Sequence, residues 1–196
     1  MRITITLSLL LLWLPIAHAQ SHLKKGDVAP VFSVLDLQGN RVEVPLKNGE
    51  KVLLVFFRYA GCVVCNFRAH ELIESYDSLR RKGIRVIGVF ESKEDLLRTY
   101  VADSEIPFPI ISDHKGQLYK KYKVEKSICK VFKGLRKKQT KYQEKEGEKL
   151  YKGKKYRRDA SLRRIPADFL IDEKGRIEIA YYGKYLGDHL PLDQLP

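Results

Sequence analysis

A nearly continuous apolar stretch, Lys51–Phe57, constrains the fold of this chain more than any other feature. So few polar positions indicate a strand that is buried on both faces, and such strands lie in the middle of parallel sheets. A second run of the same kind, Ile84–Phe90, follows, and a shorter one comes at Phe108–Ser112. Apolar residues at helical spacing separate these runs. The alternation predicts an α/β fold with helices on both faces of the sheet.

Hairpin patterns flank this alternation. Before it, Val31–Val44 contains two short alternating runs joined by a polar turn at Asp36–Asn40. After it, two strand patterns surround a turn at Asp172–Gly175. We therefore expect an N-terminal hairpin extension and a closing antiparallel hairpin, which together make the central sheet mixed. The length of 196 residues suits one domain with a good core.

The first residues have the pattern of a targeting segment. A basic start at Arg2 precedes the apolar run Leu7–Leu14, and Ala17–Ala19 matches the small-x-small pattern of a signal-peptidase site. The apolar run is shorter than a membrane-spanning helix requires. We expect a signal peptide at 1–19 and an exported chain, periplasmic or secreted, whose single domain spans 20–196. An uncleaved membrane anchor is the alternative.

Two cysteines, Cys62 and Cys65, stand between the first buried strand and a predicted helix. The helix N-terminus favours thiolate at Cys62, and Arg58 and Arg68 add positive charge. Cys65 lies one helical turn further on, within reach of a mixed disulfide. The pattern predicts a redox-active disulfide with Cys62 as nucleophile, Cys65 as resolving cysteine and Arg58 tuning the thiolate. A zinc site would need further ligands, and a structural disulfide in so short a loop would stabilise little, but both stay open. We expect no metal or organic cofactor.

The positive charge of the chain is concentrated in one segment. Residues 115–164 contain 20 lysines and arginines and 5 acidic residues, a net charge of +15, whereas the rest of the chain carries −2. Within it, about 129–164 has few aliphatic side chains and dense like charge, which predicts an exposed insertion, partly helical at best. A solvated surface is the simplest interpretation. Contact with an anionic surface is the alternative, and nucleic acid is not an expected partner of an exported chain. Cys129 is expected to be a small core residue, and a resolving or intermolecular thiol is the alternative.

Three stretches resemble a known family. The stretch KGDVAPVFSVLDLQGN resembles the entry segment of the alkyl hydroperoxide reductase/thiol-specific antioxidant group, and FFRYAGCVVC resembles an Arg-x-x-Gly-Cys-x-x-Cys variant in its peroxiredoxin-like branch. The stretch RRIPADFLIDEKGRIEIAYYGKYLGDHLPL is similar to that branch's closing segment. The resemblance implies a thioredoxin-like fold with a central mixed sheet flanked by helices, and a basic insertion before a strand that starts at a cis-proline. Pro166 matches that proline, and its cis bond would hold a backbone edge for substrate. A trans proline that opens an edge strand is the alternative.

Two departures from the family bear on function. Phe56 stands where thioredoxins have a buried acidic residue, and Cys62 stands where peroxiredoxins have threonine if Cys65 is aligned with their peroxide-attacking cysteine. The hybrid fits exchange with thiol or disulfide protein partners, with an antioxidant role open. A thiol-dependent peroxidase acting on hydroperoxides is the alternative. A non-catalytic polyanion-binding or scaffold protein on the same fold is the second alternative. The sequence leaves the oligomeric state open.

Overall fold

The computed structural model describes residues 21–46, 49–101, 105–150 and 157–196. The signal peptide expected at 1–19 lies outside these described residues. None of the helices in this part of the chain is long and apolar enough to cross a membrane.

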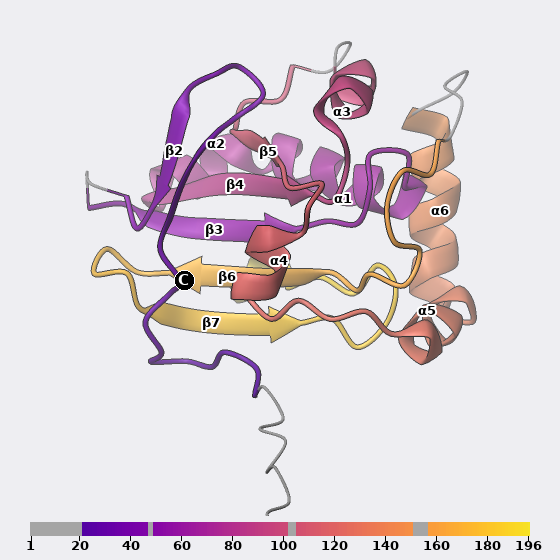
Figure 1. Ribbon diagram of the computed structural model, residues 1–196. Coiled ribbons are helices and arrows are strands. Elements are labelled where there is room, and N and C mark those ends of the chain that lie inside the picture. Colours follow the sequence, from indigo (N-terminus) through magenta and orange to yellow (C-terminus); the bar gives the residue numbers. More distant parts are fainter. Residues whose placement is uncertain (1–20, 47–48, 102–104, 151–156) are drawn as a thin grey trace, which may run out of the picture.

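A five-stranded sheet forms the centre of the molecule (Figure 1). In spatial order its strands are β5 (Ile110–Ser112), β4 (Ile84–Phe90), β3 (Lys51–Phe56), β6 (Ala167–Ile171) and β7 (Ile177–Tyr182). The first three run parallel, and β6 and β7 are antiparallel to their neighbours. The expected mixed sheet is confirmed, and the apolar stretch Lys51–Phe57 supplies its central strand.

The expected N-terminal hairpin is present as a separate two-stranded sheet of β1 (Phe32–Leu35) and β2 (Arg41–Val44). Its turn is closed by Asp36, whose carboxylate accepts the backbone N–H groups of Gln38 and Asn40 at 2.9 and 2.8 Å. An acidic residue that binds the backbone two residues on is the usual means of fixing such a turn.

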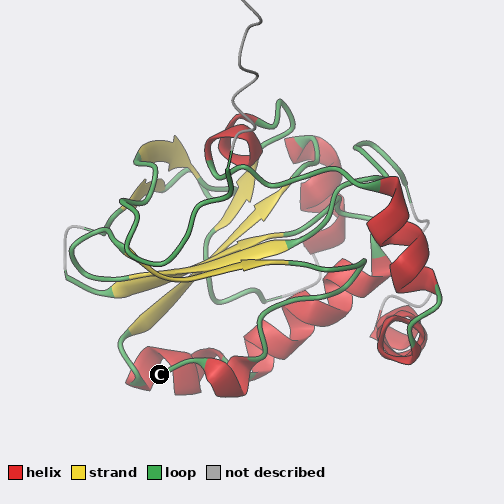
Figure 2. Ribbon diagram, turned by 90° about the horizontal axis from the view of Figure 1, so that it is seen from below, coloured by secondary structure: helices red, strands yellow, loops and turns green. Residues whose placement is uncertain are grey.

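Helices cover both faces of the sheet, as the alternation of strands and helices predicts (Figure 2). One core lies between the sheet and the first three helices, and the other lies between the sheet, α4 and the N-terminal hairpin. The helices are α1 (Val63–Glu74), α2 (Tyr76–Arg81), α3 (Glu94–Val101) and α4 (Gln117–Lys121), with a 3₁₀ turn at η1 (Leu192–Gln194). The first helix expected from the sequence is divided at Ser75, where the chain changes direction into α2.

The basic insertion is more ordered than expected. It forms α5 (Ile128–Leu135) and α6 (Lys138–Leu150), and α6 lies along α1 (Figure 1). The buried side of α6 is polar or small: Thr140 Oγ1 donates to the Leu186 carbonyl at 2.9 Å, and Gln143 Nε2 donates to the Gly187 carbonyl at 3.0 Å. Hydrogen bonds to backbone therefore replace the aliphatic contacts that the sequence lacks, and the expectation of an insertion that is partly helical at best is corrected.

The expectation of a cis bond before Pro166 is wrong. Within the described residues the only cis peptide bond is Val44–Pro45, so Ile165–Pro166 is trans. The backbone N–H of Ile165 donates to the Glu125 carbonyl, and the Pro166 carbonyl accepts the N–H of Gly183 at 2.9 Å. These bonds join the backbone at Ile165 and Pro166 to residues that are distant in the sequence.

Candidate active site

The two predicted cysteines are joined as a disulfide at the start of α1, with their Cα atoms 5.2 Å apart. Cys62 is the N-cap of the helix, and its Sγ accepts the backbone N–H of Cys65 at 3.3 Å. An N-cap position faces the unpaired N–H groups and the positive end of the helix dipole. In the reduced protein the same groups favour the thiolate form of Cys62.

Arg58 lies beside this sulfur, as the sequence predicted. Its Nη1 is 3.6 Å from Cys62 Sγ, and its Nη2 donates to the Leu162 carbonyl at 2.6 Å. The side chain is buried, which lowers the pKa of the Arg58 guanidinium, and nearby Arg158 lowers it further. Arginine nevertheless stays protonated in proteins. A buried cation in contact with the sulfur therefore adds to the effect of the helix N-terminus.

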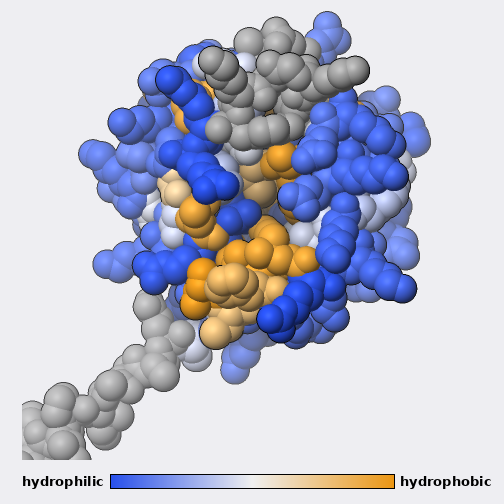
Figure 3. All heavy atoms as spheres, turned by 90° about the vertical axis from the view of Figure 1, so that its right-hand side faces the viewer, coloured by the Kyte–Doolittle hydropathy of each residue, from blue (hydrophilic) through white to orange (hydrophobic). Residues whose placement is uncertain are grey.

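Cys62 faces a groove of about 390 Å³, whereas Cys65 does not line it. Both cysteines are almost fully buried, so the groove is the route to Cys62. Figure 3 faces the side of the molecule that carries α5 and α6, where apolar side chains gather around a hollow. The groove is lined mainly by apolar residues from α1, α5 and the loop before β6, with a few charged residues at its edge: Val63, Val64, Val131, Leu135, Leu162, Leu186, Arg58, Arg158, Glu144 and Glu148.

A chain of hydrogen bonds that the sequence did not reveal braces the loop before Cys62. The N–H of Ala60 donates to Ser92 Oγ at 2.8 Å, and that hydroxyl donates to Asp159 at 2.8 Å. Asp159 also accepts the N–H of Lys93 at 2.9 Å, near the start of α3. Ser92 and Asp159 therefore tie the cysteine loop to the segment before β6.

Two other residues singled out in the sequence lie differently from expectation. Pro166 is buried and does not line the groove; Leu162, four residues earlier, does. Cys129 is an exposed free cysteine on α5, so the expectation of a core position is wrong. Its apolar neighbours misled the prediction because Ile128 and Phe132 are themselves exposed.

A buried acid–base pair lies under α1 and was missed in the sequence. Asp168 of β6 is 3.0 Å from Nδ1 of His189 and accepts the N–H of Leu190 at 2.6 Å. Burial alone would raise the pKa of Asp168, but His189, with Arg68 and that N–H, outweighs it and holds the pKa below its usual value. A single acidic residue inside the apolar run of β6 was the available signal, because a buried carboxylate requires partners.

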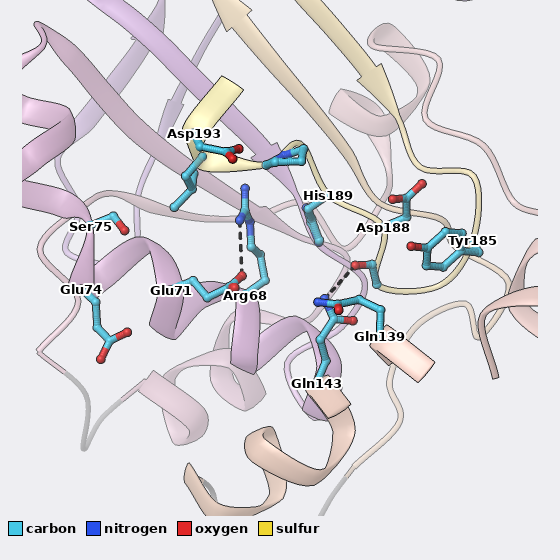
Figure 4. Close-up of a pocket in the computed structure, with 13 residues that line it drawn as sticks. Arg68, Glu71, Glu74, Ser75, Gln139, Gln143, Tyr185, Asp188, His189 and Asp193 are labelled. Carbon is cyan, nitrogen blue, oxygen red and sulfur yellow. Dashed lines mark hydrogen bonds and ion pairs between the residues drawn. The ribbon is translucent and has the colours of Figure 1, made fainter. Parts of the chain in front are cut away.

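The His189 side of this pair borders a polar pocket of about 680 Å³ (Figure 4). Arg68 enters it from α1, Gln143 from α6, and Tyr185 and His189 from the segment after β7. Arg68 donates to the Leu190 carbonyl at 2.6 Å and pairs with Glu71 at 3.3 Å. Arg68 therefore holds the C-terminal segment against α1. Neither of these bonds joins Arg68 to the sulfur atoms of the disulfide.

Comparison with known proteins identifies the family. A model described as the AhpC/TSA family matches residues 25–180. The chain belongs to this family. Peroxiredoxin Bcp of Escherichia coli K12 is 31% identical over 156 residues, which are 80% of this chain and 83% of that protein. The thiol-disulfide oxidoreductase ResA of Bacillus thuringiensis is 29% identical over 100 residues, 50% of this chain and 57% of that protein.

Solved structures agree on the fold of this AhpC/TSA member. Peroxidoxin BcpB of Mycobacterium tuberculosis matches with a TM-score of 0.62 at 14% identity, covering 85% of this chain and 90% of that one. A thiol:disulfide interchange protein DsbE from Chlorobium tepidum, so described, matches with a TM-score of 0.51 at 22% identity, covering 81% and 85%. The expected thioredoxin-like fold is confirmed, and with the paired cysteines the family membership makes the chain an oxidoreductase.

Proposed function

We propose that this protein is a thiol–disulfide oxidoreductase in which Cys62 exchanges with the cysteines of partner proteins. The observation that carries the proposal is the asymmetry of the pair: Cys62 lines the groove beside Arg58, and Cys65 lies behind it. The groove is open and largely apolar, which suits a side chain or strand of another protein better than it suits a small polar molecule.

The reaction needs only the two sulfurs and the partner. The Cys62 thiolate attacks one sulfur of the partner's disulfide and forms a mixed disulfide, while the partner's second sulfur leaves as thiolate. The Cys65 thiolate then attacks Cys62 Sγ, which releases the partner as a dithiol and leaves Cys62 and Cys65 bonded. Two electrons pass from this protein to its partner. A dithiol protein restores the reduced pair by the same steps in reverse.

Trapping the mixed disulfide tests this assignment. The reduced variants Cys62→Ser and Cys65→Ser, each made in a Cys129→Ser chain because Cys129 is an exposed thiol, are mixed with a peptide that carries one aromatic disulfide, and release of the aromatic thiol is followed. We expect Cys65→Ser to react rapidly and to keep the peptide as a stable adduct found by mass spectrometry. Cys62→Ser should react about a hundredfold more slowly, because its remaining thiol is buried and lacks the Arg58 contact. Equal rates, or an adduct only in Cys62→Ser, would reverse the roles.

A thiol peroxidase is the second candidate, favoured by the similarity to proteins named peroxiredoxins and by Arg58. The Arg58 Nε has no hydrogen-bond partner among the described residues, so the guanidinium retains a donor beside Cys62. In this reaction the Cys62 thiolate takes the distal oxygen of a hydroperoxide, giving sulfenic acid and, after protonation, an alcohol. The Cys65 thiol then forms the disulfide and releases water. Stopped-flow mixing of reduced protein with hydrogen peroxide separates the candidates: fast, saturable oxidation supports the peroxidase, and the slow rate of an ordinary thiol contradicts it.

We further propose that the chain is exported and processed after residue 19. The support is the sequence pattern of the first residues alone. Fractionation of the producing cells with N-terminal sequencing of the protein tests it, and a mature chain that starts at Gln20 in the periplasmic or secreted fraction is the expected result.

The non-catalytic alternative has its own test. A Cys62→Ser/Cys65→Ser variant with full biological activity would support it.

A further inference from the structure

The outward face of α5 carries an uncovered apolar stripe. Ile128, Phe132 and Leu135 are 48%, 55% and 46% exposed, and they follow one another at helical spacing on one side of the helix. Figure 3 shows this patch as the main apolar area of the face that carries α5 and α6. Large apolar side chains grouped on a surface indicate a place where the protein meets something else.

The helix is held so that this stripe stays outward. Ser127 caps its N-terminus by accepting the N–H of Lys130, and the N–H of Leu186 donates to the Lys130 carbonyl. The Lys130 ammonium bonds to Glu125 and to the Gly183 carbonyl. These bonds fix the inner side of α5 on the loop after β7. The stripe is therefore a stable feature of the surface and not an unfolded segment.

Positive charge surrounds the stripe. Lys126, Lys133 and Arg136 are exposed at or near the edges of α5, and neither Lys133 nor Arg136 has an ion-pair partner within the part of the chain that the structure describes. The segment 115–164 around them has a net charge of +15. An apolar helix face bordered by cations is the pattern of a helix that lies in a membrane interface, where apolar groups enter the acyl boundary and cations contact lipid phosphates.

We propose that α5 docks this protein on the surface of an anionic lipid bilayer. The apolar stripe enters the headgroup region, and the surrounding lysines and arginines contact the phosphates. Val131 and Leu135 of the same helix also line the groove at Cys62, so docking places that groove next to the bilayer surface. Leu135 belongs to both surfaces, but Ile128 and Phe132 do not line the groove. Vesicle binding by the oxidised protein therefore tests the docking surface apart from the chemistry proposed for the cysteines.

Cys129 provides a specific probe, because it is exposed on α5 and is the free cysteine of the oxidised protein. The full chain is labelled at Cys129 with an environment-sensitive fluorophore and mixed with vesicles of phosphatidylcholine alone or with phosphatidylglycerol added. We expect a blue shift, and quenching by lipids brominated on the acyl chains, only with the anionic vesicles. A label at Gln38 of the N-terminal hairpin, placed by Gln38→Cys in a Cys129→Ser chain, should show neither change. This comparison separates α5 from any binding by the N-terminal residues.

Substitutions divide the surface into its two parts. Lys133→Glu/Arg136→Glu should weaken binding to anionic vesicles by at least about tenfold, since each cation near such a surface contributes. Ile128→Ser/Phe132→Ser should remove the quenching by brominated lipid. The matched controls, Lys24→Glu/Lys25→Glu for charge and Val31→Ser/Leu35→Ser for exposed apolar area, should bind as the unchanged chain does.

Three results would overturn the proposal. The first is a label at Cys129 that stays in a water-like environment with anionic vesicles, and the second is an equal response with phosphatidylcholine alone. The third is a blue shift at Cys129 with soluble polyglutamate and none with vesicles, which would make α5 a docking site for acidic proteins.

Discussion

Arg58 contributes a positive charge to the cysteine site from a buried position, where water screens that charge only weakly. Its guanidinium is buried, 3.6 Å from Cys62 Sγ, and is held in place by the Leu162 carbonyl. A buried charge acts more strongly on a neighbouring group than an exposed one, because solvent screens it less. Arg58 and the start of α1 therefore act together on the same sulfur.

Replacing Arg58 should raise the pKa of the reduced Cys62 thiol. In a Cys65→Ser/Cys129→Ser chain, which leaves Cys62 as the free thiol, Arg58→Gln is expected to raise that pKa by about one unit or more, the usual effect of losing an adjacent opposite charge. The measurement is the pH dependence of alkylation by iodoacetamide, with the ultraviolet absorbance of the thiolate as a second readout.

The conservative variant Arg58→Lys separates charge from structure. It keeps the positive charge but loses the paired hydrogen bonds of the guanidinium. If charge tunes the thiolate, Arg58→Lys shifts the pKa of Cys62 less than Arg58→Gln does. Equal shifts in the two variants would show that Arg58 acts through the position of the Leu162 segment, and no shift in either would remove it from the site.

At the scale of elements, α6 packs against α1, the helix that begins at the cysteine pair. Gly147 of α6 lies so close to the start of α1 that an added Cβ would be 2.5 Å from the Val63 carbonyl and 2.8 Å from Val63 Cγ1. Val63 directly follows Cys62, so the position of α6 affects the first turn of α1, next to the cysteine pair.

Gly147→Ala is therefore expected to destabilise the protein. In an exposed helix this change would increase stability by about 1 kcal/mol, because alanine favours the helix more than glycine does. Here the collision with Val63 should reverse the sign and cost about 1–3 kcal/mol, the range for overpacked sites. Urea unfolding of the oxidised chain measures the difference. Lys145→Ala, at an exposed position of the same helix, is the control and should change stability by less than about 0.5 kcal/mol. A gain in stability for Gly147→Ala would contradict the close contact.

These elements also show which parts of the structure the sequence can predict. β3 and β4 were predictable because buried strands have continuous apolar runs, and the pairing of Cys62 with Cys65 was predictable because it is local. The docking of α6 was not, since Thr140 and Gln143 bond to backbone carbonyls and Gly147 lies close to Val63, and these buried residues leave no apolar periodicity. Periodicity detects helices that pack through aliphatic side chains, and α6 packs by close approach and hydrogen bonds.

The same limit explains two further differences at the candidate site. α5 does have an apolar stripe, but the stripe faces outward. Composition cannot distinguish an outward apolar face from an inward one, and for this reason Cys129 was wrongly expected in the core. The backbone around Pro166 bonds to Glu125 and Gly183, which lie far from it in the sequence, and no local pattern records such partners. Features that depend on distant partners were the ones that sequence reasoning missed.

At the scale of the whole molecule, Asp168 joins three segments that are distant in the sequence. It lies on β6, in register with Val55 of β3, and it binds His189 and Leu190 of the C-terminal segment. Arg68 of α1 bonds to the Leu190 carbonyl and lowers the pKa of Asp168. The sheet, the cysteine helix and the C-terminal segment thus meet at one buried carboxylate, so its ionisation should affect the stability of the fold as a whole.

The pH dependence of stability should reveal this carboxylate. Because the pKa of Asp168 is lowered in the folded protein, its charged form stabilises the fold above the unfolded pKa of about 4, and this stability is lost as the pH falls through the folded pKa. Asp168→Asn should therefore cost about 2 kcal/mol near neutral pH, through unsatisfied buried partners, and progressively less below about pH 4. Urea unfolding at a series of pH values measures the difference between the two chains.

Asp113 supplies a comparison of opposite sign. Burial raises the pKa of Asp113, despite the N–H groups of Gln117, Leu118 and Tyr119 that its carboxylate accepts. A carboxyl with a raised pKa contributes stability at low pH that is lost as the pH rises through its folded value. The cost of Asp113→Asn should therefore shrink as the pH rises above about 4, whereas the cost of Asp168→Asn grows as the pH rises towards about 4 and stays level above it. If both costs change in the same direction with pH, or if the cost of Asp168→Asn is the same at every pH, then the ionised Asp168 does not stabilise the junction of β6, α1 and the C-terminal segment.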